Sequence, residues 1–348
     1  MDAKIHGMTK KGPVRPHKQQ QRRPTLGDLA KLGGVSKMTV SRALHNGALV
    51  SEGTRLAIQK LARKHGYRPN ISARNLRLQR NDVVAVVIEM VPSLGRPMSG
   101  PYPLEILGGI CQEMTSRGNN LMLTTMQNWR AESTHHADGV ILLGQGAHDT
   151  AAKSLGTAGI PFVVWGAQRA GSPYVVVGSD NRHSGVLAAE RLLSLGRQRL
   201  VFLGDTTHPE LADRHAGFVD TLKGTGATLV ASVPVGFTFA AGAAAVQSLL
   251  ADAETRFDGL FASNDLLAMG ATRTLIEHRR RVPDEVSVIG HDDSPAGAGF
   301  IPALTSVHQS WSDGGVLLAR KVLELIGGRR AKSEQLSTTL VVRDTRSV

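Results

Sequence analysis

Residues 25–55 read TLGDLAKLGGVSKMTVSRALHNGALVSEGTR, and the organisation of the whole chain follows from this stretch. Thr25 is followed three residues later by Asp28, the spacing of a capping box, which predicts that a helix begins here. Gly33 and Gly34 end that helix and allow a tight turn. The first helix is therefore short, and the chain turns directly after it.

A second short helix is expected over residues 37–44, with Ser36 as its cap. Two short helices joined by a turn of three or four residues that contains glycine form a helix-turn-helix. In this motif the second helix enters the major groove of DNA, and its N-terminal residues contact base edges. The outward side of this helix carries Lys37, Met38, Ser41 and Arg42. The stretch therefore predicts sequence-specific binding to double-stranded DNA.

Two further helical segments are expected after the motif. The third helix is expected over residues 53–65, capped by Ser51 or Thr54. Asn70 can cap a fourth segment that runs to residue 79. We expect a helical DNA-binding domain over residues 23–69 and a further helical segment over residues 70–80.

The charge of the chain is concentrated in its first quarter. Residues 1–80 hold 18 Lys and Arg against 3 Asp and Glu, a net charge of +15. The remaining 268 residues hold 23 and 26, a net charge of −3. This asymmetry is the electrostatic pattern of a phosphate-binding module joined to an ordinary domain. A basic tail on a membrane-surface protein is disfavoured, because no stretch approaches the roughly 18 apolar residues of a membrane helix.

Residues 1–22 form a basic tail with almost no apolar side chains. We expect it to be disordered, since it cannot bury enough surface to offset its ordering entropy. It also lacks the apolar run of a secretory signal. The single cysteine, Cys111, excludes an internal disulfide framework and fits a reducing cytoplasm. Its helical surroundings predict a small buried apolar side chain.

From residue 81 onward the pattern changes to apolar runs that alternate with helical segments. This alternation predicts an α/β domain of doubly wound parallel sheets. About 265 residues is more than one such sheet with its helices usually contains, so we expect two lobes. Strands are expected at 83–88, 121–125, 139–143, 162–165, 175–178, 200–204, 229–233, 259–262, 286–290 and 336–342, and helices at 103–117, 150–158, 183–195, 212–223, 240–251, 265–279 and 313–326.

Polar side chains follow several of these strands. Ligands of open parallel sheets bind beyond the carboxyl ends of the strands, so these side chains are candidates for a binding site. A helix cap is the alternative role for each Asp, and for Asp265 the two roles are equally favoured. The candidates are Gln145, Asp180, Asn181, Asn264, Asp265, His291, Asp292 and Asp293.

The quoted stretch, together with GYRPNISARNL at residues 66–76, resembles the headpiece and hinge of the LacI/GalR family of bacterial repressors. Residues 37–42, KMTVSR, resemble the gluconate-utilisation repressors within that family. The segments VGSDN, LGRQRLVFLG, FASNDLLAMGATR, RRVPDEVSVIGHDD and IPALTSVHQ match family blocks in order. The resemblance covers residues 23–328.

The resemblance implies an effector domain over residues 81–348, with two lobes like those of periplasmic sugar-binding proteins and three crossovers between them. It also implies a homodimer on a palindromic operator in the cytoplasm, a small-molecule effector and no cofactor. Leu76 matches the leucine that the family wedges into the minor groove. The DNA-contacting residues that it implies are Thr25, Ser36, Lys37, Met38, Thr39, Ser41, Arg42, Asn46, Tyr67, Asn70, Ala73 and Leu76.

For the effector, the resemblance implies contacts from Arg214, Phe237, Asn264 and Asp292, to which the strand-end argument adds Asp180 and Asp265. A sugar or a sugar acid such as gluconate is the expected ligand, with Arg214 as the carboxylate partner. A purine-type corepressor is the alternative within the family. One departure is the short connection at residues 126–138, which allows one or two helical turns where similar proteins have a full helix.

Two other protein classes fit the sequence less well. A periplasmic sugar-transport protein would need a signal peptide and would have no headpiece. An α/β enzyme would need a convergent catalytic set, and Asp149 stands where the dinucleotide fingerprint beginning at Gly144 requires glycine. The adjacent His135 and His136 favour a solvated loop over a metal site. We therefore expect no catalytic and no metal-binding residues.

Overall fold

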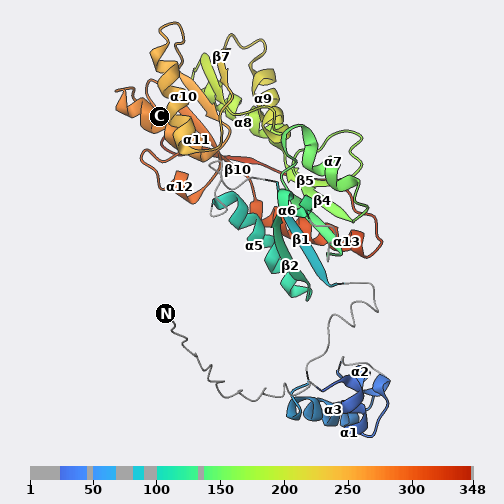
Figure 1. Cartoon of the computed structure of the whole chain (residues 1–348). Coiled ribbons are helices and arrows are strands. Elements are labelled where there is room, and N and C mark those ends of the chain that lie inside the picture. Colours follow the sequence, from blue (N-terminus) through green and yellow to red (C-terminus); the bar gives the residue numbers. More distant parts are fainter. Residues whose placement is uncertain (1–23, 45–49, 68–80, 90–99, 132–136, 346–348) are drawn as a thin grey trace, which may run out of the picture. The chain divides into compact units, whose positions relative to one another are not determined.

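The chain divides into two units, residues 1–78 and residues 79–348 (Figure 1). The structure, a computed structural model, describes residues 24–44, 50–67, 81–89, 100–131 and 137–345. The tail at residues 1–22 and the hinge segment at residues 70–80 lie outside the described residues, as do His135 and His136.

Three helices make up the described part of the first unit: α1 (Leu26–Leu32), α2 (Lys37–Leu44) and α3 (Glu52–Lys64). The predicted capping box is confirmed, since the Thr25 side chain accepts from the backbone N–H of Asp28 and the Asp28 carboxylate accepts from that of Thr25. Ser51 caps α3, so the alternative cap Thr54 is excluded.

A small apolar core joins these helices, with side chains contributed by all three. Leu29 and Val40 are fully buried, and Ile58 closes the core from α3. Gly33 touches that core, because a Cβ atom at this position would lie 2.7 Å from Ile58 Cδ1. The glycine turn therefore lets α3 pack directly under the junction of α1 and α2.

The second unit contains two six-stranded sheets with the same strand order in their parallel parts. The first sheet runs β11-β5-β4-β3-β1-β2, and the second runs β12-β10-β9-β8-β6-β7. Among the strands that the structure describes, only β12 pairs antiparallel, against β10. The first sheet consists of β1 (Val83–Ile88), β2 (Asn120–Thr125), β3 (Gly139–Leu143), β4 (Phe162–Trp165), β5 (Val175–Ser179) and β11 (Glu334–Leu336). The second consists of β6 (Arg199–Leu203), β7 (Thr228–Val233), β8 (Gly259–Ala262), β9 (Ser287–Asp292), β10 (Thr305–His308) and β12 (Thr339–Val341).

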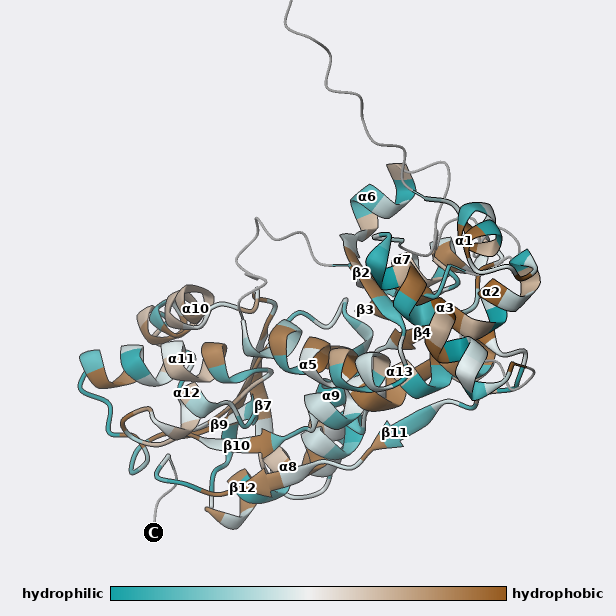
Figure 2. Ribbon diagram, turned by 90° about the horizontal axis from the view of Figure 1, so that it is seen from below, coloured by the Kyte–Doolittle hydropathy of each residue, from teal (hydrophilic) through white to brown (hydrophobic). Residues whose placement is uncertain are grey.

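Helices cover both faces of each sheet, as the alternation of apolar runs predicts. In β1, Val84 and Val86 face the core under α5 and α13, whereas Ala85 and Val87 face the core under α6 and α7. Figure 2 shows hydrophobic residues along α5 and α13, which lie next to each other. The helices of the first lobe are α5 (Pro101–Ser116), α6 (Met126–Ala131), α7 (Thr150–Gly156) and α13 (Trp311–Ile326). Those of the second lobe are α8 (Asn181–Ser194), α9 (Pro209–Leu222), α10 (Phe239–Ala251), α11 (Asp265–Glu277) and the short α12 (Pro295–Ala298).

Three helix pairs cross at glycine: α5 with α13, α8 with α9, and α10 with α11. At each crossing, a Cβ atom added to either glycine would lie 2.0–2.2 Å from a backbone carbonyl oxygen of the partner helix. No side chain fits such a gap, so these crossings require the missing Cβ. The glycines are Gly109 and Gly315, Gly185 and Gly217, and Gly242 and Gly270.

The chain passes between the lobes three times, as the resemblance implies: from β5 to α8, from β10 to α13, and from β11 to β12. The prediction of a single last strand at residues 336–342 is wrong. The segment forms two short strands, because the third crossing falls between Leu336 and Thr339 and each strand joins a different sheet.

Two further predictions from the sequence concern the first lobe. The prediction of a buried Cys111 is wrong, because this thiol lies on the exposed side of α5. The short connection after β2 holds the six-residue helix α6, in line with the one or two turns expected. Trp129 of α6 is buried against the sheet, so this small helix still covers part of that face.

Candidate functional site

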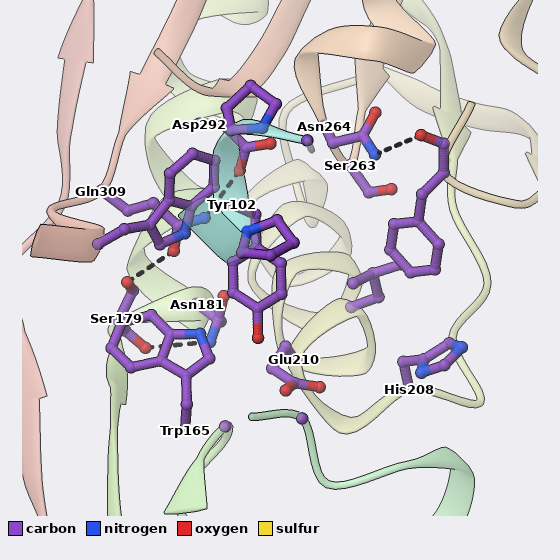
Figure 3. A pocket seen from close by; sticks show the side chains of 18 of the residues that line it. Tyr102, Trp165, Ser179, Asn181, His208, Glu210, Ser263, Asn264, Asp292 and Gln309 are labelled. Carbon is purple, nitrogen blue, oxygen red and sulfur yellow. Dashed lines mark hydrogen bonds between the residues drawn. The ribbon is translucent and has the colours of Figure 1, made fainter. Parts of the chain in front are cut away.

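A cavity of about 180 Å³ lies between the two lobes, at the carboxyl ends of strands from both sheets (Figure 3). This is where open parallel sheets bind ligands. The first lobe contributes Glu89, Gly100, Pro101, Tyr102, Pro103, Gly144, Gln145, Gly146, Trp165, Gly166 and Trp311, the second His208, Glu210, Leu211, Arg214, Phe237, Ser263, Asn264, Asp265, Leu266, Asp292, Ser294 and Ala296, and the crossings Ser179, Asn181 and Gln309.

Aromatic side chains of the first lobe form one wall of the cavity. Tyr102, at the start of α5, meets Trp311 edge to face with 5.6 Å between ring centroids. Trp165 ends β4, and its ring lies against Gly314 of α13, where a Cβ atom would be 2.3 Å from the ring. Aromatic surfaces of this kind commonly stack on the apolar faces of ligands.

Arg214 of α9 lies in the opposite wall and is only 7% exposed. Its Nε donates to Asn181 Oδ1 at 2.8 Å, and Nη1 donates to the backbone carbonyl of Ser263 at 2.6 Å. Burial lowers the pKa of the guanidinium, and the nearby carboxylates of Asp292 and Glu210 act against that shift. The side chain is therefore fixed in place as a cation in a mostly dry site.

Asp292 ends β9 with a backbone φ of 118°, a region that side chains rarely adopt. Its Oδ1 accepts from Gln309 Nε2 at 2.7 Å and lies 3.0 Å from Nδ1 of His291. Burial lowers the pKa of His291 well below its usual value, so this ring is neutral. The strained backbone and these contacts direct the carboxylate toward the crossing segment that carries Gln309.

Asp265 follows β8 at the start of α11 and is almost fully buried. It does not cap the helix, so that alternative is wrong: Asn264 is the cap, accepting from the backbone N–H of Leu267. Asp265 Oδ2 instead accepts from the backbone N–H and hydroxyl of Ser294, and Oδ1 accepts from the Ser306 hydroxyl. Burial and then the negative charge of Asp292 raise the pKa of Asp265 to about 7.

Phe237 and Asn264 both line the cavity on the side of the second lobe. The Asn264 amide donates to the backbone carbonyl of Phe237 at 3.2 Å. The Phe237 ring meets His208 edge to face, 5.3 Å between centroids. These contacts hold the loop after β7 against the start of α11.

Asp180 does not line the cavity, and neither do the strand-end candidates His291 and Asp293. The carboxylate of Asp180 accepts from the backbone N–H of His183 at 2.9 Å and caps α8. The neighbouring Asn181 faces the cavity instead. The Asp180 carboxylate therefore has the alternative role, that of a helix cap.

Sequence reasoning missed several cavity residues. Glu89, Ser179 and Ser263 stand at or directly after the ends of β1, β5 and β8, so the strand-end rule could have found them. Others stand at helix starts or on the crossings, where no local pattern sets them apart. These are Tyr102, His208, Glu210, Gln309 and Trp311.

The headpiece presents a second candidate surface on α2. Lys37, Met38 and Arg42 are exposed, and Met38 is 60% exposed although apolar. Such an exposed methionine on a recognition helix suits contact with base edges or thymine methyl groups. Val40 and Ala43, on the opposite side of α2, are buried.

The other DNA-contact candidates divide into two groups. Ser36 accepts from the backbone N–H of Thr39 at 3.0 Å, Thr25 belongs to the capping box, and Tyr67 packs against the headpiece core. Ser41 lies on α2 beside Arg42. Asn46, Asn70, Ala73 and Leu76 lie outside the described residues.

Comparisons with known families agree with this division of the chain. Residues 25–70 match the lacI family of bacterial regulatory proteins, and residues 189–346 match the periplasmic binding protein-like domain. Among the described residues, no helix has the length and apolar character that a membrane span needs. Within the same ranges, no group of three or more His, Cys, Asp or Glu could hold a metal ion.

Two curated relatives are similar over nearly their whole length. The HTH-type transcriptional regulator CelR of Thermobifida fusca is 32% identical over 346 residues, covering 94% of this chain and 99% of that protein. The HTH-type transcriptional regulator GntR of Pseudomonas aeruginosa is 30% identical over 325 residues, covering 90% and 92%. HTH-type transcriptional repressors named PurR are also similar, among them that of Mannheimia succiniciproducens at 26% identity over 92% of this chain and 97% of that protein.

Solved structures give the same picture. A complex of the transcriptional regulator CelR with cellobiose superposes with a TM-score of 0.70 at 30% identity, covering 93% of this chain and all of that one. The lac repressor dimer bound to operator and an anti-inducer superposes with a TM-score of 0.81 at 22% identity, covering 93% and 99%. The second match establishes the fold.

Proposed function

This chain belongs to the lacI family of bacterial regulatory proteins and is a transcriptional regulator, and we propose that it represses transcription as a homodimer on a palindromic operator. The lac repressor structure supports this proposal, since that protein binds operator as a dimer. A two-fold symmetric regulator places two recognition helices about one helical turn of DNA apart.

The headpiece binds DNA through charge and through α2. The net +15 of residues 1–80 supplies phosphate contacts that set affinity and register. Lys37, Met38 and Arg42 read bases from the exposed side of α2. In this proposal the headpiece spans residues 23–69, the hinge helix spans 70–80 with Leu76 as the minor-groove wedge, and the basic tail at residues 1–22 precedes both.

The effector domain, residues 81–348 in this proposal, binds a small molecule between its lobes. The observation that carries this step is the buried Arg214, held by Asn181 and by Ser263 at the wall of a cavity to which both lobes contribute. A ligand that contacts both walls favours one arrangement of the lobes over another. The change in operator affinity that it causes is limited by the difference in its own affinity for the two arrangements. Arg214, Phe237, Asn264 and Asp292 contact the ligand, and Asp265 supports the floor of the site.

A saccharide is the ligand class that the relatives favour, since CelR was solved with cellobiose. The recognition helix led us to expect a sugar acid such as gluconate, and the similarity to GntR is consistent with that expectation. The similarity to PurR proteins keeps a corepressor role as the second candidate. In that case the ligand would strengthen operator binding instead of releasing it.

We also propose that the protein acts in the cytoplasm and catalyses no reaction. The family consists of regulatory DNA-binding proteins, and the cavity residues are engaged in fixing one another rather than in a nucleophile and base arrangement. A sugar-transport protein is the rival from another class, and the DNA-binding headpiece argues against it.

The proposal is tested by selecting operator sequences from random DNA with the full-length protein. We expect one palindromic sequence to be enriched and to be bound by two subunits, as measured by light scattering of the complex. Deletion of residues 1–80 should abolish this binding and leave a folded effector domain. Recovery of random DNA only, or operator binding by the truncated protein, would contradict the proposal.

A further inference from the structure

We infer that the cavity selects an uncharged polyhydroxyl ligand and that Glu210, with Glu89, excludes anionic ones. This inference rests on the proposed effector site and names its ligand class. It departs from the sugar-acid expectation that the sequence suggested. Four carboxyl groups line the cavity, and Arg214 is the one guanidinium or ammonium group among the lining residues that the structure describes.

Arg214 is already engaged by the protein. Its hydrogen bonds to Asn181 and to the carbonyl of Ser263 hold Nε and Nη1 on the protein side. Asp292 and Glu210 both lie close enough to stabilise its positive charge. A ligand carboxylate would therefore approach a cation whose charge is largely balanced, and it would meet the repulsion of two carboxylates in a partly dry site.

Glu210 and Glu89 place negative charge on opposite lobes. Glu210 lies in the first turn of α9, one turn before Arg214, and Figure 3 shows it within the group of cavity residues. Glu89 follows β1, and its carboxylate lies over the loop at Gly146, where a Cβ atom would be 2.9 Å from Glu89 Oε1. An anion in the cavity would thus face carboxylates from both walls.

Hydroxyl groups fit this set of side chains better than a carboxylate does. Ser263 Oγ and Trp311 Nε1 are buried and have no hydrogen-bond partner among the described residues. Each needs an acceptor atom of the ligand, whereas the ionised carboxylates of the cavity interact favourably only with hydrogen-bond donors. A hydroxyl serves both needs because it donates one hydrogen bond and accepts others, but an ionised carboxylate only accepts.

The aromatic wall adds a second reason for a neutral, ring-shaped ligand. Tyr102, Trp165 and Trp311 line the first-lobe side of the cavity. Their faces carry partial negative charge, which suits C–H groups of a sugar ring and repels an anion. The ligand that meets all these conditions has a saturated ring with hydroxyls directed at both lobes.

The test compares matched pairs of probes that differ in one charge. Calorimetry with the full-length protein would use glucose and gluconate, galactose and galactonate, ribose and ribonate, and cellobiose and cellobionate. We expect at least one neutral probe to bind, and its acid partner to bind at least tenfold more weakly. Tighter binding of an acid, or binding of no neutral probe, overturns the inference.

Substitution of the carboxylates assigns the selectivity to named residues. Glu210→Gln keeps hydrogen-bonding capacity and removes one charge, so the acid partner should gain affinity about tenfold relative to the neutral probe. Glu89→Gln should act in the same direction. Glu190→Gln removes the same charge from an exposed position on α8 outside the cavity and should leave the ratio unchanged. An unchanged ratio in both cavity variants overturns the role of these residues.

Operator binding separates this inference from the proposed function. Each variant is also measured for binding to the selected operator without any sugar. If operator binding is preserved but the cavity prefers acids, the proposed function as a regulator holds and the inference of a neutral ligand is rejected. If the wild-type protein does not bind the selected operator, the proposed function is rejected instead.

Discussion

Gly185 of α8 lies against the backbone carbonyl of Arg214 in α9, so closely that a Cβ atom at Gly185 would be 2.0 Å from that oxygen. Gly217 makes the reciprocal contact with the carbonyl of Arg182. The position of the Arg214 side chain thus depends on how closely two helices approach. A residue without a side chain therefore helps to place a charged group of the binding site.

The first prediction follows from this crossing. Gly185→Ala forces α8 and α9 apart and should lower the free energy of unfolding by about 1–3 kcal/mol, as overpacking does. It should also weaken effector binding, because Arg214 moves with α9. Chemical denaturation and calorimetry measure the two effects.

Gly156→Ala is the matched control. Gly156 ends α7 with open space where its Cβ would be, so alanine there should be neutral or slightly stabilising. Equal stability losses in both variants would show that helix propensity, and not the crossing, sets the effect.

The second prediction concerns Arg214 itself. Arg214→Ala removes a charged hydrogen-bonding group and leaves Asn181 Oδ1 without its donor, so effector affinity should fall roughly tenfold to a hundredfold. Operator binding should persist, since the headpiece is untouched. In cells the variant should repress without responding to effector. A wild-type response would remove Arg214 from the site.

The third prediction concerns the headpiece. Operator affinity should fall steeply with salt, with a slope in log affinity against log salt of about −0.9 for each phosphate contact. Arg42→Ala should relax discrimination at one base position by about 1–3 kcal/mol, because Arg42 is exposed on the recognition face of α2. Competition binding to operators that carry single substitutions measures this effect.

Arg55→Ala offers a control for the loss of charge alone. Arg55 lies on α3, where it pairs with Glu52 at 2.6 Å. We expect this variant to keep the base preferences of the wild-type protein. A uniform loss over all operator variants for Arg42→Ala would make Arg42 a phosphate contact instead of a base contact.

Local patterns in the sequence predicted most of the elements, but they missed β10 and merged β11 with β12. Apolar runs gave the strands because a parallel strand is buried on both faces, and Asn264 and Asp292 followed from the strand-end rule. The sequence could not show that Asp180 caps α8 while Asn181 lines the cavity. Both residues follow β5, and their roles depend on the residue at which α8 begins. Trp311 and Glu210 reach the cavity through helix packing between distant segments, which no local pattern records.

The fourth prediction is a pH dependence that comes from Asp265. Burial and the charge of Asp292 raise the pKa of Asp265 to about 7, against 3.8 for an unperturbed aspartate. Between these values the folded protein holds a proton that the unfolded chain has released. Asp265 therefore makes the free energy of unfolding fall as pH rises toward 7, by at most about 1.4 kcal/mol per pH unit.

Asp265→Asn isolates this contribution, because asparagine does not titrate. Its one amide oxygen can accept from the backbone N–H and hydroxyl of Ser294, and its NH2 group can donate to the Ser306 hydroxyl oxygen, which now accepts. The buried His291 acts in the opposite direction, since its lowered pKa makes stability rise with pH below the ordinary histidine value, but it is present in both proteins. We therefore expect the difference in unfolding free energy, variant minus wild type, to increase from pH 5 to about pH 7 and to level off above pH 8. Urea denaturation at half-unit steps measures it, and a difference that stays flat would mean that Asp265 is ionised in the folded protein throughout.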